Sequence, residues 1–226
     1  MKAIIEFYQG LTSQVQATIW VTLFLLLLII FIRIKMKKYS AEEPPKGIVA
    51  LAESFVGMMN DFTKNTIGKR WRSLAPYFIT LAMFLFTANI SGLFGFTPPT
   101  TSLTVTFTMA LITFSLVQVY GVKSQGLLGH LKGFTEPIPL LLPINLISEL
   151  SSVLSLSFRL FGNILSGAII TTLLYSFLGG FAVLVTPAFH ALFDIAFGVL
   201  QTLVFCMLTA VYISNKLPED EIENFE

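Results

Sequence analysis

The stretch from Ile144 to Thr172 reads INLISELSSVLSLSFRLFGNILSGAIITT, and it decides what kind of protein this is. It is apolar enough to enter a membrane, yet its polar side chains recur every three or four residues and so form one stripe on a helix. These polar positions are Asn145, Ser148, Glu149, Ser152, Ser155, Arg159, Asn163 and Ser166. Arg159 is the only lysine or arginine between Lys132 and Lys216, and arginine stays charged in proteins. A permanent cation deep in a membrane costs from ~2.5 to over ~10 kcal/mol, so we expect a functional reason for this residue.

The composition places the whole chain in a membrane and argues against an enzyme. Of the 226 residues, 54% are hydrophobic and 12% charged, against about 25% charged in ordinary soluble domains. The net charge of +1 gives no general attraction to nucleic acid. The single cysteine, Cys206, rules out a disulfide within the chain. No glycine-rich phosphate loop, HExxH motif or nucleophile elbow appears, so we expect no catalytic centre, cofactor or metal site, which leaves ion movement.

The apolar stretches predict an all-α polytopic membrane protein, a single membrane domain with five transmembrane helices and one amphipathic interfacial helix. About 20 apolar residues are needed to cross a ~30 Å hydrocarbon core. The expected transmembrane helices cover residues 15–34, 74–96, 103–122, 144–178 and 186–215. The last two exceed what a bilayer requires, so we expect them to form a long tilted hairpin. Thr186 before Pro187 predicts the start of its second arm.

Charge placement predicts how the chain is oriented in the membrane. Residues 46–66 carry apolar side chains at helical spacing with a polar far side, which predicts an amphipathic helix on the cytoplasmic face. A re-entrant or soluble linker helix is the alternative. Lysines and arginines cluster after residue 32, before residue 74 and after residue 122. The positive-inside rule then places the N-terminus outside and the C-terminus in the cytoplasm.

A second polar stripe runs along the last expected helix. Its members are Thr186, His190, Asp194 and Gln201, which share one helical face. Polar atoms that face lipid cost several kcal/mol each, so the stripes of the two arms meet each other or a third partner. We favour a proton or ion path for Asp194, with simple ion pairing as the alternative.

The other polar residues of the hairpin have structural alternatives of their own. Arg159 is either an ion-handling residue or a structural cation paired with Asp194 or Glu149. Glu149 lines an ion path or extends to the cytoplasmic rim of the membrane. His190, Asn163 and Gln201 belong to the path or only form hydrogen bonds between helices.

The segment SLSFRLFGNILSG, residues 155–167, closely resembles the signature of subunit a of F-type rotary ATP synthases. The match is an arginine followed by leucine, phenylalanine, glycine and asparagine in the fifth membrane helix. The segments PYFITLAMFLFTANISGLFGFTPPT (76–100) and LQTLVFCMLTAVYIS (200–214) agree with the same family, so the resemblance covers nearly the whole chain. It implies a non-catalytic stator subunit of a bacterial plasma membrane, with lipid, a ring of c-subunits and the peripheral-stalk b-subunits as partners.

The resemblance also implies roles for individual residues. Arg159 is expected to meet each c-ring carboxylate in turn, to make it release its ion, and to block leakage between two offset half-channels. Asn163 and Gln201 match positions that flank the arginine, and Glu149 matches an acidic position on the cytoplasmic side. The family couples ion flow through these half-channels to ring rotation and to ATP synthesis or hydrolysis.

One departure from the family pattern concerns the acid of the outer half-channel. Many bacterial members carry glutamate where this chain has Ala168, and often histidine where it has Asp194. We infer that Asp194 supplies the missing carboxylate. The change leaves open whether the coupling ion is H+ or Na+. A self-contained secondary transporter and a purely structural scaffold are the other functions to be weighed, although the repeat-related broken helices of a transporter are not evident.

Overall fold

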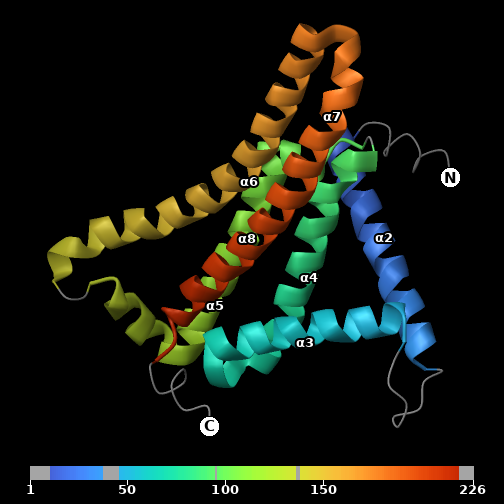
Figure 1. Cartoon of the computed structure of the whole chain (residues 1–226). Helices are drawn as coiled ribbons and strands as arrows, with labels where there is room; N and C mark the ends of the chain where they lie inside the picture. Colours follow the sequence, from blue (N-terminus) through green and yellow to red (C-terminus); the bar gives the residue numbers. More distant parts are fainter. Residues whose placement is uncertain (1–10, 38–45, 95, 136–137, 219–226) are drawn as a thin grey trace.

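The computed structural model describes residues 11–37, 46–94, 96–135 and 138–218, and this part of the chain contains helices and no strand. Four stretches are long and apolar enough to cross a membrane, the last of which is folded back on itself (Figure 1). Those stretches are Ser13–Met36, Ile48–Phe94, Leu103–Gly133 and Pro139–Ser214. The prediction of an all-α polytopic membrane protein is therefore confirmed.

The helical elements follow one another with short connections. The α-helices are α2 (Ser13–Met36), α3 (Ile48–Ile67), α4 (Trp71–Ile90), α5 (Leu103–Gly133), α6 (Leu142–Leu178), α7 (Ala182–His190) and α8 (Phe197–Ser214). The shorter elements are η1 (Gly68–Arg70), η2 (Ser91–Phe94), η3 (Pro99–Thr101), η4 (Pro139–Leu141), η5 (Gly179–Phe181) and the π-helical segment η6 (Ala191–Ala196).

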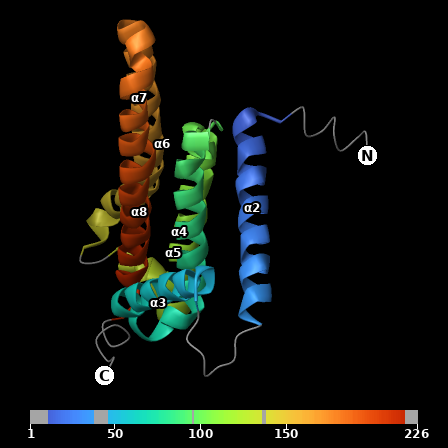
Figure 2. The same cartoon turned by 45° about the vertical axis from the view of Figure 1, so that its right-hand side comes forward.

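Helix α2 has an apolar surface on all sides and lies at the flank of the molecule opposite the hairpin (Figure 2). Only Val21 and Leu25 are buried along its 24 residues. An apolar helix with so little protein contact is suited to lipid on most of its circumference. Arg33 and Lys35 occupy its last turn, where cations favour the helix C-terminus and mark the edge of the apolar region.

Helix α3 lies across one end of the bundle, where Figures 1 and 2 show it crossing the end of α4 and approaching α8. Met59, Thr63 and Ile67 are buried on one face, whereas Leu51 and Met58 are exposed on the other. The predicted amphipathic helix thus has two apolar edges, one against protein and one free for a membrane surface. Gly68 follows it with a φ of 74°, a backbone conformation that favours glycine, and there the chain turns into α4.

The core forms where α3, α4, α5, α6 and α8 meet. Its largest fully buried apolar side chains are Ile67, Leu74, Phe78, Leu85, Leu160, Phe205 and Ile213. Small residues allow some of these helices to approach closely. A β-carbon on Gly198 of α8 would lie 2.9 Å from the β-carbon of Asn89 on α4. The core therefore fixes α8 against α4, and α8 in turn positions the second arm of the hairpin.

Helix α5 differs from the expected span of residues 103–122. Its helical assignment continues to Gly133, but Gly126 interrupts it with φ 74° and ψ 164°, which is not helical. Only glycine adopts this conformation without strain, so the chain changes direction there. The segment after the break returns His130 to the first part of the helix, where its ring lies against Gly121.

Helices α6, α7 and α8 form the expected hairpin, which is inclined to α4 in Figure 1. At ~1.5 Å per residue, the 37 residues of α6 extend for roughly 55 Å. The predicted start of the second arm at Thr186 is wrong, because α7 already begins at Ala182 and Pro187 lies inside it. The 3-10 turn at Gly179–Phe181 leads directly into helix, so the arm is already helical before the proline, which only removes one backbone donor.

Candidate functional site

Asp194 occupies an irregular part of the second arm, the π-helical segment η6. Insertions of this kind shift the register of a helix and often occur at functional sites. His190 Nδ1 lies 2.8 Å from Asp194 Oδ2, one turn earlier along the chain. The Asp194 side chain is 15% exposed and that of His190 38%. The carboxylate is thus mostly covered, while the imidazole connects it to the surface of the molecule.

Two glycines make room for the segment that carries Asp194. A β-carbon on Gly92, in η2 at the end of α4, would lie 3.3 Å from Asp194 Oδ2. A β-carbon on Gly167, in α6, would lie 3.3 Å from the side chain of Phe193. The Asp194 carboxylate therefore points toward the end of α4, and α6 approaches the π-helical segment closely from another side.

Asn163 and Gln201 join the two arms of the hairpin. Asn163 Nδ2 donates a hydrogen bond to Gln201 Oε1 at 2.6 Å. Gln201 is only 4% exposed. Its Nε2 is buried without a hydrogen-bond partner among the described residues. An unsatisfied buried donor is costly, so this amide is available to an ordered water or to a group that arrives from outside the chain.

Arg159 lies one helical turn before Asn163 on α6 and is exposed on the surface of the isolated chain. Among the described residues its guanidinium has no ion-pair or hydrogen-bond partner. Both candidate acidic partners make other contacts, since Asp194 contacts His190 and Glu149 contacts Lys216. The structure thus does not contain the static intramolecular pair that was the alternative for the arginine.

Glu149 lies in a separate polar cluster toward the beginning of α6. One carboxylate oxygen forms an ion pair with Lys216 Nζ, and the other accepts a hydrogen bond from Gln118 Nε2 of α5. Gln118 Oε1 in turn lies 2.7 Å from His130 Nε2. The side chains of Glu149 and Lys216 are 16% and 24% exposed. This carboxylate of α6 is therefore held by Gln118 of α5 and by Lys216, which follows α8.

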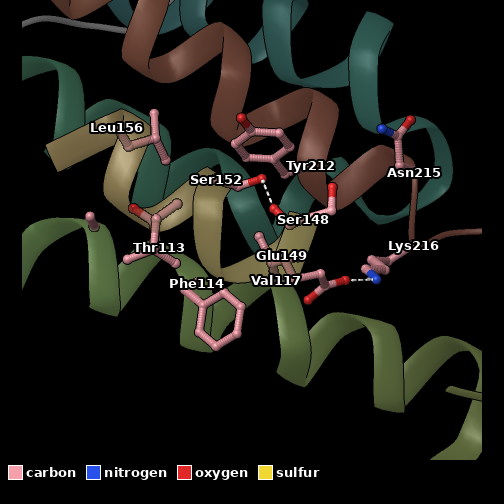
Figure 3. Close-up of a pocket in the computed structure, with 12 residues that line it drawn as sticks. Thr113, Phe114, Val117, Ser148, Glu149, Ser152, Leu156, Tyr212, Asn215 and Lys216 are labelled. Carbon is pink, nitrogen blue, oxygen red and sulfur yellow. Dashed lines mark hydrogen bonds and ion pairs between the residues drawn. The ribbon is translucent and has the colours of Figure 1, made fainter. Parts of the chain in front are cut away.

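The cluster forms part of the wall of a cavity of about 250 Å³ between α5, α6 and the end of α8, which we call the Glu149 cavity. Figure 3 shows Glu149 and Lys216 pointing toward each other at its edge. Polar groups from Thr113, Ser148, Ser152, Tyr212 and Asn215 also line it. A cavity of this size and polarity has space and partners for several water molecules.

The order of these groups along α6 is the main geometric result. Glu149 precedes Arg159 by ten residues, a rise of roughly 15 Å. Gly167, which contacts the π-helical segment of Asp194, follows Arg159 by eight residues, or roughly 12 Å. The exposed cation is therefore located between two partly buried carboxylates, each in a polar cluster of its own.

Comparison with known proteins identifies the family. The model of the family described as "ATP synthase A chain" matches residues 16–214. The chain belongs to this family. It is 34% identical over 197 residues to "ATP synthase subunit a" of Moorella thermoacetica, which covers 87% of each protein. It is 32% identical to the protein of that name from Mycoplasma genitalium, over 94% of this chain and 82% of the relative.

A third relative bears on the coupling ion. The chain is 32% identical over 226 residues to "ATP synthase subunit a, sodium ion specific" of Propionigenium modestum, which covers 93% of this chain and 75% of the relative. As an ATP synthase A chain, the protein is a multi-pass, ion-translocating subunit of the membrane sector, and the catalytic sites of the complex lie in other subunits. It works in a complex with those subunits, which sets aside the self-contained transporter and the pure scaffold.

In this ATP synthase A chain the predicted site residues fall into three places. His190 and Asp194 lie together, Asn163 and Gln201 lie together beside Arg159, and Glu149 lies apart from both groups. The sequence analysis missed Lys216, Gln118 and His130 as partners of Glu149. Features of the sequence point to two of them in hindsight: Gln118 is a lone amide in an apolar span, and Lys216 is the first lysine or arginine after Arg159.

Proposed function

We propose that this chain forms two offset ion half-channels against a rotating c-ring, with Arg159 as the barrier between them. The observation that supports this most is the exposed guanidinium without a partner in the described chain, located between the clusters of Asp194 and Glu149. A charge that is costly in a membrane and unpaired within its own subunit calls for an anionic partner outside it. A carboxylate on each c-subunit is such a partner.

The outer half-channel in this proposal contains Asp194 and His190. Their contact at 2.8 Å offers two titratable groups that exchange a proton with water on one side and with the ring on the other. Gly92 keeps the space beside the carboxylate open. Asp194 thereby supplies the acid that this chain lacks at Ala168.

The inner half-channel is the Glu149 cavity, open to the cytoplasm. Asn163 and Gln201 fix the separation of α6 and α8 near Arg159, and the buried Gln201 Nε2, which has no partner among the described residues, is available to an ordered water beside the path. When that carboxylate meets Arg159, the fixed positive charge favours its ionised form, so the ion leaves into a half-channel. The same charge repels cations that would cross directly between the half-channels.

Coupling follows from this separation of the two inlets. A membrane potential supplies about 2.3 kcal/mol per elementary charge per 100 mV. This energy drives rotation only when each ion has to travel with the ring from one half-channel to the other. The ion is H+ in our proposal, and Na+ is the alternative to be tested, since one relative is described as sodium ion specific.

The orientation belongs to the same proposal. Five crossings, with the N-terminus outside and the C-terminus in the cytoplasm, place α3 and the Glu149 cavity on the cytoplasmic side of a bacterial plasma membrane. The first ten and last eight residues lie outside the described part of the chain. The amphipathic α3 and the apolar surface of α2 lie on the lipid and peripheral-stalk side, away from the ring.

The decisive experiment replaces Arg159 in the whole complex reconstituted in vesicles. We expect Arg159→Ala to abolish ATP-driven ion pumping while the complex still assembles, because no group within the described chain depends on this side chain. Arg33→Ala, an exposed cation at the end of α2, is the matched control and should pump normally. Pumping assays with and without Na+ identify the ion. Normal coupled pumping by Arg159→Ala would reject the proposed role.

A further inference from the structure

Lys216 has no assigned role, yet it lines the Glu149 cavity and contacts the carboxylate at its edge. It follows the last turn of α8 and forms an ion pair with Glu149, 67 residues away along the chain. Two further contacts hold it in place. Gln125 Nε2 donates a hydrogen bond to its backbone oxygen at 2.9 Å, and its ammonium lies 4.8 Å from the ring centroid of Phe134. A lysine fixed by this many groups is not a freely moving surface cation.

The groups that face Glu149 come from each element packed around it. Lys216 approaches from the end of α8, and Gln118 from α5, with His130 behind it. Tyr212 lines the same cavity from α8. Lys216 is therefore the only lysine or arginine among the described residues that contacts this carboxylate.

We propose that Lys216 is a positioning residue of the inner half-channel, and that its ammonium prevents Glu149 from retaining the transported cation. This inference rests on the proposed function of the cavity. A lone carboxylate in a mostly enclosed site holds a proton or Na+ strongly, because the surrounding medium screens its charge poorly. Conduction requires that the ion binds favourably enough to enter the cavity and weakly enough to leave it. The ammonium offsets the carboxylate charge, and ions pass the cavity without being trapped.

Gln118 and His130 complete the arrangement on the other carboxylate oxygen. His130 lies so close to Gly121 that a β-carbon there would be 2.7 Å from the imidazole ring. The break of α5 at Gly126 lets His130 reach this position. The two oxygens of Glu149 thus have separate partners, which orients the carboxylate along the cavity wall and leaves the cavity interior to water.

The first test measures ATP synthesis by the whole complex at constant driving force while the pH on the side of the catalytic subunits is varied. K216Q removes the positive charge that offsets the carboxylate, so release of the transported proton from the cavity should require a higher pH on that side. The pH at which synthesis is half-maximal should therefore move upward by ~1 unit or more. K216R, which retains the charge, should keep the wild-type pH profile, as should the control K123Q, an exposed lysine of α5 outside the cavity. If the ion is Na+, the Na+ concentration on the side of the catalytic subunits is varied instead of the pH.

The second test uses Glu149 to separate charge compensation from a structural role. E149Q leaves an unpaired ammonium, which repels the entering cation, so transport should slow. E149Q/K216Q removes both charges and should transport faster than E149Q, with its pH profile returned to that of the wild-type protein. If Lys216 has a purely structural role, the double variant should transport no faster than either single variant.

Two results would overturn the inference: a pH profile of K216Q that coincides with that of K123Q, or a double variant that transports no faster than E149Q. If K216Q does not assemble, the comparison of E149Q with the double variant still decides. The Arg159→Ala complex separates this inference from the function on which it rests. Loss of pumping in Arg159→Ala together with an unchanged K216Q profile rejects the role of Lys216 alone.

Discussion

Arg159 and Asp194 have very different surroundings in the structure. The carboxylate is 15% exposed, has His190 at 2.8 Å and lies against Gly92, whereas the guanidinium is exposed without a partner in the described chain. Covering a carboxylate next to a titratable imidazole suits a group that binds and releases protons. Leaving an arginine uncovered suits a group whose counter-charge arrives from another subunit.

The residue-scale prediction concerns Asp194, the carboxylate that we propose for the outer half-channel. Asp194→Asn keeps the volume and the contact with His190 but removes the group that ionises, so ATP-driven pumping should fall by about tenfold or more. The control is Glu53→Gln, an exposed carboxylate on α3, and it should pump at the normal rate. Proton uptake by inverted vesicles measures both. Equal, mild effects of the two substitutions would remove Asp194 from the path.

At the scale of elements, the contact between α4 and α8 determines where the second arm of the hairpin lies. Asn89 of α4 donates to the backbone oxygen of Gly198 at 3.3 Å, and the absence of a side chain at Gly198 makes this approach possible. One turn later, Gln201 faces α6 and contacts Asn163. Packing against α4 thus fixes α8, and α8 in turn positions Gln201 against Asn163 beside Arg159.

Gly198→Ala tests this contact. The added β-carbon would lie 2.9 Å from the Asn89 side chain, which is closer than van der Waals contact allows. We expect a loss of about 1–3 kcal/mol in stability, typical of overpacking, together with slower pumping. Gly180→Ala, in the hairpin turn with open space around it, is the control. Thermal unfolding of the purified complex should show a lower midpoint for Gly198→Ala only, and equal midpoints would contradict the close packing.

At the scale of the whole molecule, the hairpin is longer than a membrane is thick. Its first arm measures roughly 55 Å along the helix path, against a hydrocarbon core of ~30 Å, so it must incline or bend, and Figure 1 shows that α6 is bent. Its far end is apolar, with exposed Phe177, Phe181 and Leu184, and so this end remains in an apolar environment. An inclined helix presents a long flank to a neighbour, which suits contact with several subunits of a ring in succession.

The orientation in the membrane gives the prediction at this scale. The ends of α2 are accessible at Thr12 and Lys37, and the native Cys206 is buried and so contributes little background. A membrane-impermeant maleimide should label Thr12→Cys in intact cells and Lys37→Cys only after permeabilisation, because the cations after residue 32 remain inside. The inverse labelling pattern would show that the topology is the reverse of the proposed one, with the Glu149 cavity on the outer side of the membrane.

The sequence by itself determined the class of the protein, the approximate bounds of its helices, and the polar residues that are costly to place in a membrane. Hydrophobic length and helical periodicity are local properties, and they locate a membrane helix and its polar stripe without knowledge of its neighbours. The lone arginine and the motif that follows it pointed to the family before any helix was placed. The start of the second arm was misjudged at Thr186, because the local proline rule does not show that a 3-10 turn already leads into helix at Ala182.

Only the tertiary structure decided which polar groups are partners. The contacts of Glu149 with Lys216 and Gln118, and the approach of Asp194 to Gly92, join residues that are far apart in the chain. Such contacts depend on the rotation and translation of whole helices, on the break at Gly126 and on the register shift of the π-helical segment. No local pattern specifies these quantities, because they result from packing among α4, α5, α6 and α8 as a set.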